Sequence, residues 1–303
     1  MTDYSGYVAA LGTAFLFSFG STFFTISGRE IGSATVNRVR ILIAWLVIIA
    51  IHALTFGQPL PFNATAQQWF WMGLSGFVGL ALGDAFLFQG FVMVGPRLSM
   101  LMMALAPVIG AILAFVFLGE RLQLQDFFAI ILVVSGIAWV VSDKAESNGA
   151  GQTKSFTRRY WIGLAFAFGG AVGQAGGLVL SKIGLQDGFE PLSANLIRVT
   201  IAVISIWAVG IANGQFMNTF RQVKAHPRAG ALLTLGALTG PVSGVWLSLI
   251  AVQRAPVGIA STLMALTPIF LIPISYVVFR DKPTLRAIVG TLVAFAGTAL
   301  FFL

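Results

Sequence analysis

Ten long apolar segments, separated by short polar stretches, constrain this chain more than any other feature. A helix needs about 20 apolar residues to cross a bilayer core of about 30 Å. Strands are not expected, because the segments lack the alternation of apolar and polar residues that a membrane barrel requires. The sequence therefore predicts an all-α, multi-pass protein of the cell membrane, with transmembrane helices over residues 7–27, 34–56, 68–91, 98–118, 125–142, 160–183, 192–213, 229–252, 257–279 and 285–303.

The composition favours lipid over water as the surroundings of this chain. Hydrophobic residues make up 57% of it and charged residues only 9%, whereas soluble domains carry about 25% charged residues. The net charge of +8 does not indicate nucleic-acid binding, because the basic residues lie in small groups between apolar runs. Cysteine is absent, and His52 and His226 are the only histidines. We therefore expect neither a metal site nor any other cofactor.

The second half of the chain repeats features of the first half. Residues 103–107, Met-Ala-Leu-Ala-Pro, reappear at 264–268 as Met-Ala-Leu-Thr-Pro, a shift of 161 positions. The same shift joins Gly79 to Gly240, Gly83 to Gly244 and Gly136 to Gly297, and a shift of 158 joins Asn37 to Asn195 and Arg40 to Arg198. Because these matches keep one order along several helices, they indicate an internal duplication.

The duplication predicts two five-helix repeats, 1–142 and 160–303, joined by a polar linker over 143–159. Five is an odd number, so the second repeat enters the membrane from the opposite side. Inverted repeats of this kind are typical of secondary transporters, whose binding site lies in a central cavity between the halves.

The ten segments, the paired Ala-Leu-x-Pro motifs at 104–107 and 265–268, and Gly-Glu-Arg at 119–121 resemble the drug/metabolite transporter (DMT) superfamily. Within it, the chain resembles the EamA-type branch of ten-helix transporters, which includes amino-acid exporters. The resemblance covers nearly the whole chain and implies both the fold and a transport function. It is much less specific for substrate, since the superfamily moves amino acids, sugars, nucleotide sugars and drugs.

Pro107 and Pro268 lie near the middles of the fourth and ninth segments. Each proline removes one helical hydrogen bond, which frees the carbonyl groups of Met103 and Met264, four residues earlier. These carbonyls either bind substrate in the cavity, or the prolines only kink their helices and neighbouring groups pair the carbonyls.

Asp84 is the only acidic residue well inside an apolar segment. An ionisable group at that depth is costly and suggests function, namely binding a substrate amine or exchanging a proton. The alternative is a carboxyl group paired inside the bundle for structural reasons. The counterpart of Asp84 in the second half is Val245. Phe88 and Trp246 are candidates for an apolar wall of the site, or for ordinary packing residues.

Arg40 and Arg198 lie about two turns into the second and seventh segments, with Asn37 and Asn195 on the same helix faces. Either these arginines hold a carboxylate or gate the two halves, or they snorkel to the nearer headgroups. The sixth segment contains a glycine-rich run over 169–177. Small residues at this spacing predict close helix packing, which would leave Gln174 as a polar contact in the site.

The basic residues also predict an orientation. Loops after odd-numbered segments carry twelve Lys and Arg residues, and loops after even-numbered segments carry three. The positive-inside rule then places both termini outside the cell, whereas the family resemblance implies termini inside.

These features predict a secondary transporter that works as a monomer by alternating access. It would export amino acids, aromatic or of broad range, with drugs, sugars or nucleotide sugars as the alternative within the superfamily. A channel or an intramembrane enzyme is less favoured, because rings of charge, paired aspartates and a Ser-His site are all missing from the pattern. No GxxxxGK[ST] motif occurs, so transport is expected to be passive or coupled to an ion gradient.

Overall fold

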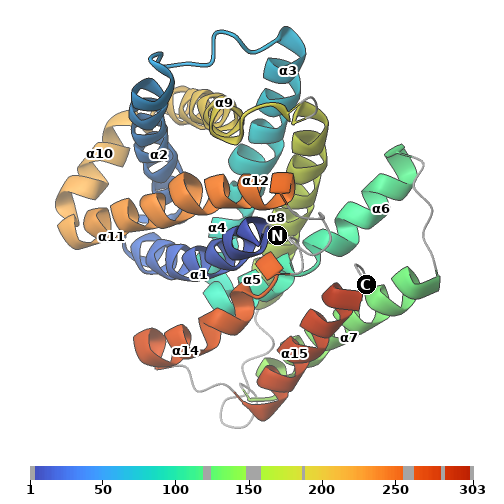
Figure 1. Cartoon of the computed structure of the whole chain (residues 1–303). Helices are drawn as coiled ribbons and strands as arrows, with labels where there is room; N and C mark the ends of the chain where they lie inside the picture. Colours follow the sequence, from blue (N-terminus) through green and yellow to red (C-terminus); the bar gives the residue numbers. More distant parts are fainter. Residues whose placement is uncertain are drawn as a thin grey trace.

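The computed structural model describes residues 4–118, 124–147, 158–185, 188–254, 263–280 and 284–300. Within these ranges the chain folds into helices joined by turns, with no strand (Figure 1). In the described part of the chain, six helices are long and apolar enough to cross a membrane, and four shorter apolar helices accompany them. All ten fall on the predicted segments, so the prediction of an all-α, multi-pass membrane protein is confirmed. The inversion of one half relative to the other stays a prediction.

The helices of the two halves follow a similar order, except that the second half has the additional short helix α10. The first half consists of α1 (Ser5–Ile31), α2 (Ser33–Phe56), α3 (Ala66–Ser75), η1 (Gly76–Gly83), α4 (Asp84–Val94), α5 (Pro96–Met103), α6 (Ala106–Leu118) and α7 (Leu124–Ser147). The second half consists of α8 (Arg158–Gly184), α9 (Pro191–Ala212), α10 (Phe216–Ala225), α11 (Pro227–Ala237), η3 (Leu238–Gly244), α12 (Val245–Arg254), α14 (Thr267–Phe279) and α15 (Leu285–Leu300).

The third and eighth apolar segments each change to π-helix near their middles. In the first half, η1 separates α3 from α4, and in the second half, η3 separates α11 from α12. Glycines in η1 and the proline within η3 weaken the ordinary helical pattern, since Pro241 has no N–H to donate. The two π-helical segments end at Gly83 and Gly244, immediately before Asp84 and Val245.

The fourth predicted helix, 98–118, is in fact two helices, which corrects the expectation of a single kinked span. A turn at Ala104 and Leu105 ends α5, and the amide nitrogens of both residues bond to carbonyl oxygens three residues back, at 3.0 Å. Leu266 makes the same kind of bond to Leu263 at 3.2 Å in the second half. Pro107 and Pro268 therefore lie in the first turns of α6 and α14, where proline needs no N–H partner.

Two further boundaries differ from expectation. Helix α7 runs to Ser147, five residues into the predicted linker, because Lys144, Ala145 and Glu146 favour helix and continue it. Residues 148–157 of that linker lie outside the described residues. Helix α10 was not predicted, because it is short and follows α9 after only a brief turn.

The packing interleaves the two halves. Helix α1 lies along α11, η3 and α12 of the second half, and α8 lies along α3, η1 and α4 of the first half. Helices α2 and α9, one from each half, pack against each other. Helices α7 and α15 form a closely packed pair at one side (Figure 1).

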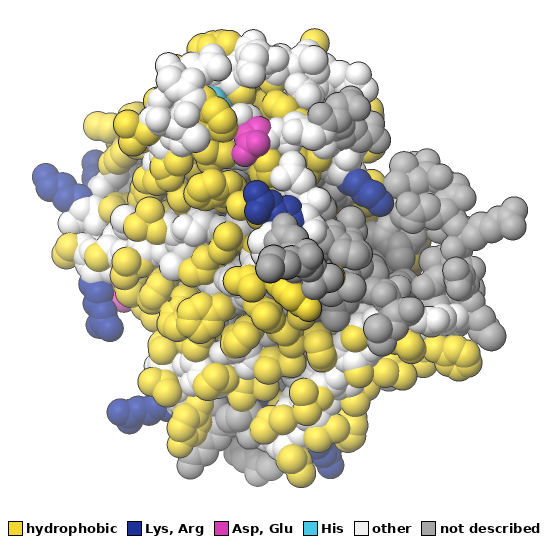
Figure 2. Space-filling view, viewed as in Figure 1, with side chains coloured by type: hydrophobic (Ala, Val, Ile, Leu, Met, Phe, Trp, Pro, Cys, Tyr) yellow, Lys and Arg dark blue, Asp and Glu magenta, His cyan; other side chains and the backbone are white. Residues whose placement is uncertain are grey.

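Hydrophobic side chains cover much of the visible surface, and Lys and Arg occur there singly or in small groups (Figure 2). Large apolar side chains such as Leu54 and Val277 are exposed, at 88% and 76%. In water such a surface would be costly, but lipid is an equally apolar surrounding. This apolar outer surface is therefore the one expected of a protein whose helices contact lipid.

Candidate functional site

A cavity opens where the two halves meet, and it encloses about 800 Å³ of empty space, including the part open to the outside. Helices α1, α2, α4, α5, α8, α9 and α12, with both π-helical segments, contribute to its wall. The lining residues are Phe17, Gly20, Ser21, Phe24, Arg40, Leu80, Asp84, Leu87, Phe88, Phe91, Met100, Met103, Gln174, Leu178, Arg198, Gly240, Pro241, Val245 and Ser248.

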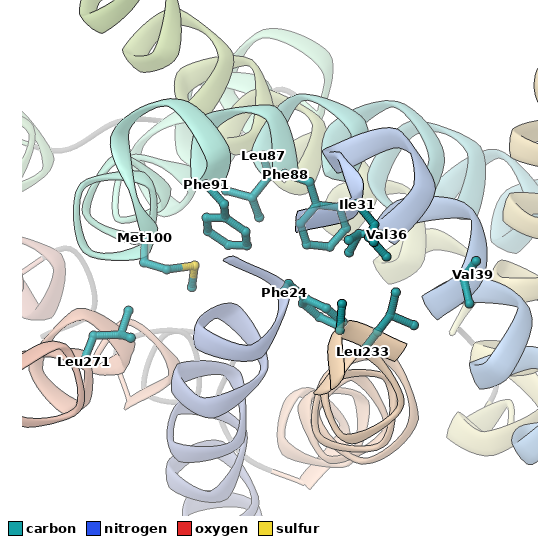
Figure 3. Close-up of a cluster of buried hydrophobic side chains, with 11 residues drawn as sticks. Phe24, Ile31, Val36, Val39, Leu87, Phe88, Phe91, Met100, Leu233 and Leu271 are labelled. Carbon is teal, nitrogen blue, oxygen red and sulfur yellow. The ribbon is translucent and has the colours of Figure 1, made fainter. Parts of the chain in front are cut away.

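Aromatic and aliphatic side chains form one wall of this cavity (Figure 3). Phe24 from α1 faces Phe88 from α4, with ring centroids 5.1 Å apart in an edge-to-face arrangement. Phe91 lies one turn further along α4, 5.5 Å from Phe88. Met100 from α5 belongs to the same buried cluster. This wall suits an apolar group of a ligand, since such groups gain free energy when they leave water.

Arg40 and Asp84 form a buried ion pair in the cavity wall. The Nη2 of Arg40 lies 2.5 Å from Oδ2 of Asp84, and the two side chains are 3% and 13% exposed. Arg40 also donates from Nε and Nη2 to Oδ1 of Asn37, at 3.1 and 2.8 Å. Its guanidinium stands over the ring of Phe88, 4.4 Å from the centroid. The snorkelling alternative for Arg40 is therefore wrong, because its charge points into the protein.

Arg198, the equivalent of Arg40 in the second half, has different surroundings. It is 4% exposed and lines the same cavity, so it does not snorkel either. Its guanidinium has no hydrogen-bond partner among the described residues, and Nε is fully buried. Asn195 does not bind it: Oδ1 of Asn195, the atom that could accept from a guanidinium, has no hydrogen-bond partner among the described residues, and Nδ2 donates to the carbonyl of Pro241 at 3.1 Å.

Close contacts between glycines bring α8 and η1 together and place Gln174 at the cavity. A Cβ atom on Gly173 would lie 2.4 Å from Cα of Gly83, and one on Gly177 would lie 2.9 Å from Cα of Gly79. Such distances leave no space for a side chain. The prediction that the glycine-rich run packs closely is confirmed, and Gln174 lies between these contacts, partly buried in the cavity wall.

The structure brings six of the predicted site residues together, since Asp84, Phe88, Met103, Gln174, Arg40 and Arg198 all line the cavity. Four others lie elsewhere. Trp246 packs against the cluster between α2 and α9. Met264 packs against a small cluster around Ala9, and its carbonyl accepts a hydrogen bond from Oγ1 of Thr267 at 2.9 Å. Pro107 and Pro268 are not among the described residues of the cavity wall.

Sequence reasoning missed the contribution of α1, whose Phe17, Ser21 and Phe24 line the cavity. No charge or motif marks these positions, so only the fold reveals them. It also missed the pairing of Arg40 with Asp84. The sequence did contain a signal for this pair. An acidic and a basic residue inside the apolar part of neighbouring transmembrane helices are costly unless they form an ion pair.

Comparison with known proteins agrees with this architecture. The model of the EamA-like transporter family matches residues 4–142 and, separately, residues 161–303. A relative from Streptantibioticus cattleyicolor (strain ATCC 35852) described as a probable terminal-alkyne amino-acid exporter is 25% identical over 240 residues, covering 76% of this chain and 71% of that protein. One protein crystal structure, 15% identical in sequence, superposes with a TM-score of 0.59 and covers 97% of this chain and 96% of that one. Since the family model spans most of both halves, this chain belongs to the EamA-like transporter family.

Proposed function

We propose that this transporter exports amino acids or similar small metabolites, and that it works by alternating access between two inverted five-helix repeats. The observation that carries the proposal is the cavity between the halves, which combines charged groups with an aromatic wall. A carboxylate finds a guanidinium there, and an apolar side chain finds the aromatic wall. The name of the relative from Streptantibioticus supports amino acids as the substrate class.

The two repeats of the proposal are residues 1–142 and 160–303. Three observations support a duplication: the separate matches of one family model, the π-helical segments η1 and η3, and the helix breaks at 104–105 and 265–266. Transporters built in this way expose a central site to either side of the membrane by moving one half against the other. Within the cavity, Asp84, Phe88, Met103 and Gln174 are the proposed substrate contacts.

Flux into vesicles that contain only the purified protein tests this function. A panel of radiolabelled amino acids, sugars, nucleotide sugars and lipophilic drugs separates the substrate classes. We expect saturable uptake of at least one amino acid, recovered chemically unchanged from the vesicle interior. Flux that never saturates would indicate a channel, a modified product would indicate an enzyme, and uptake restricted to sugars or drugs would exclude amino acids.

Repeating the assay at two pH values with Asp84→Asn tests the role of the carboxylate. If Asp84 takes part in transport, the variant changes the rate or its pH dependence. The matched control is Arg254→Gln, because Arg254 is an exposed residue at the end of α12. Unchanged transport and unchanged pH dependence in Asp84→Asn would remove this residue from the mechanism.

A further inference from the structure

We propose that Arg198 is an anion subsite, and that a substrate is recognised by its carboxylate there and not by its amino group. This inference rests on the proposed function, and it assigns the recognised chemical class to a small carboxylate with an apolar side chain. Four observations carry it: the charge count of the cavity, the position of Val245, the unpaired state of Arg198 and the aromatic wall of the same cavity.

Among the residues that the structure describes, the charged ones in the cavity wall are Arg40, Asp84 and Arg198. Arg40 and Asp84 neutralise each other through their 2.5 Å contact. One positive charge of the described cavity wall therefore has no balancing acid, and Arg198 is the guanidinium that forms no ion pair there. A buried charge without a partner is unfavourable, and a ligand with one negative charge would remove that cost.

The element order explains why Arg198 lacks the partner that Arg40 has. Asp84 begins α4 directly after η1, and Val245 begins α12 directly after η3. Both residues line the cavity. The second half therefore has a valine at the position from which the first half supplies a carboxylate. We infer that a carboxylate of the substrate takes the place that an acidic residue at 245 would occupy.

Arg198 is suited to this task by its burial and by what surrounds it. The side chain is 4% exposed, and its guanidinium has no hydrogen bond to any part of the chain that the structure describes. A planar guanidinium binds a carboxylate through two parallel hydrogen bonds. The wall of Phe24, Phe88 and Phe91 in the same cavity can then receive the apolar side chain of the ligand.

The described part of the cavity wall offers no unpaired acidic group that could bind the amino group of a substrate. Asp84 is the only acid in the cavity wall among the described residues, and Arg40 already neutralises it. A substrate ammonium would have to compete with a guanidinium held by both Asn37 and Asp84. The amino group therefore contributes little to affinity, and a deaminated analogue should bind at least as well as the amino acid.

Two matched sets of ligands test this inference on the purified full-length protein. One set is L-phenylalanine, hydrocinnamate and phenethylamine, and the other is L-leucine, isocaproate and isoamylamine. Within each set the second compound lacks the amino group and the third lacks the carboxylate. We expect both carboxylates to raise the melting temperature of the protein and both amines to leave it unchanged. A larger shift from the amines, or no shift from any carboxylate, would overturn the inference.

Arg198→Gln should weaken carboxylate binding by about tenfold or more, since hydrogen bonds between charged groups are among the strongest in proteins. The same variant should be at least as heat-stable as the original without ligand, because it removes an unpaired buried charge. A purely structural arginine would give the opposite result, a loss of stability with ligand binding retained. Arg254→Gln is the matched control and should bind every ligand as the original does.

Val245→Asp provides a test that leaves Arg198 in place. The new carboxylate should pair with Arg198 and abolish the binding of hydrocinnamate and isocaproate, whereas Val245→Asn should weaken it much less. Equal binding by the two variants would overturn the inference. Vesicle flux distinguishes it from the proposed function: carboxylate binding without transport rejects only the transport proposal, and transport with amines preferred rejects only the subsite.

Discussion

Arg40 and Asp84 depend on each other at the scale of single residues. Arg40 is buried and Asp84 is largely buried, and Arg40 is also held by Asn37 and by the ring of Phe88. Removing one member of a buried ion pair leaves the other charge without compensation, which costs more than the pair itself contributes. The pair therefore fixes α2 against α4 beside the cavity.

A double-mutant cycle tests this dependence. Arg40→Gln or Asp84→Asn alone should each lower the free energy of unfolding by about 3 kcal/mol. The double variant should lose much less than the sum, because no unpaired charge remains. Denaturation of the purified protein in detergent measures all three values. Strictly additive losses would show that the two residues do not act as a pair.

Gly76 is a second residue whose role follows from local geometry. A Cβ atom there would lie 2.2 Å from the backbone carbonyl oxygen of Arg198, so η1 and α9 touch through their backbones. Backbone cannot move aside as a flexible side chain can. Gly76→Ala should therefore destabilise the protein by about 3 kcal/mol, as overpacked cores do.

Gly110 in α6 is the matched control, because a Cβ atom there would meet nothing within 4 Å. Gly110→Ala should be neutral or should stabilise by about 0.5 kcal/mol, since alanine favours helix over glycine. Melting temperatures of the two variants, measured side by side, decide the comparison. Equal stability of the two variants would contradict the close approach of η1 to α9.

At the scale of elements, hydropathy predicted which segments are helical but not how each helix is interrupted. Apolar length alone located the ten segments, because lipid leaves few alternatives to a helix. The π-helical segment η1 depends on its close contacts with α8 and α9, and η3 depends on Pro241. The turn at 104–105 depends on backbone hydrogen bonds to carbonyls three residues back, which the local sequence does not specify. Most of the site was predictable for a related reason, since charges in apolar segments are conspicuous, whereas the cavity face of α1 carries no such mark.

Helix α10 illustrates an element held by a few polar contacts. Arg38 donates from Nη1 to Oγ1 of Thr219 at 2.6 Å and from Nη2 to Oε1 of Gln215. The indole of Trp207 donates to the carbonyl of Arg38 at 3.2 Å and packs against Phe216. Arg38 thus joins α2 to the start of α10.

Arg38→Gln should release α10 while the rest of the protein stays folded. We expect the amide protons of Phe216–Ala225 to exchange about tenfold faster, because two charge-assisted hydrogen bonds are lost. Hydrogen exchange followed by mass spectrometry measures this change. Arg221→Gln, on an exposed position of the same helix, should leave the exchange unchanged. Faster exchange throughout the protein would instead mean that Arg38 supports the whole fold.

At the scale of the whole molecule, each half completes the packing of the other. Helix α1 packs on the third segment of the second half, and α8 packs on the third segment of the first half. Both third segments contain a π-helical stretch and border the cavity. A movement of one half against the other would therefore act directly on η1 and η3. These segments end immediately before Asp84 and Val245, the first residues of α4 and α12.

The proposed inversion makes a definite statement about which side of the membrane each loop faces. Asn63 follows the second apolar segment, Asn213 is the C-cap of α9 in the seventh, and both residues are exposed. In an inverted repeat these equivalent loops lie on opposite sides. The bias of basic residues toward loops after odd-numbered segments further places Asn213 inside the cell and Asn63 outside.

Single cysteines at these positions test both statements, and the absence of native cysteine keeps the background low. In intact cells, a membrane-impermeant maleimide should label Asn63→Cys fully and Asn213→Cys only after the cells are opened. The reverse pattern would keep the inversion and reject the orientation drawn from charge, because the loops would still face opposite sides. Labelling of both residues from the same side would reject the inverted repeat itself, since two equivalent loops of oppositely oriented halves cannot share a side.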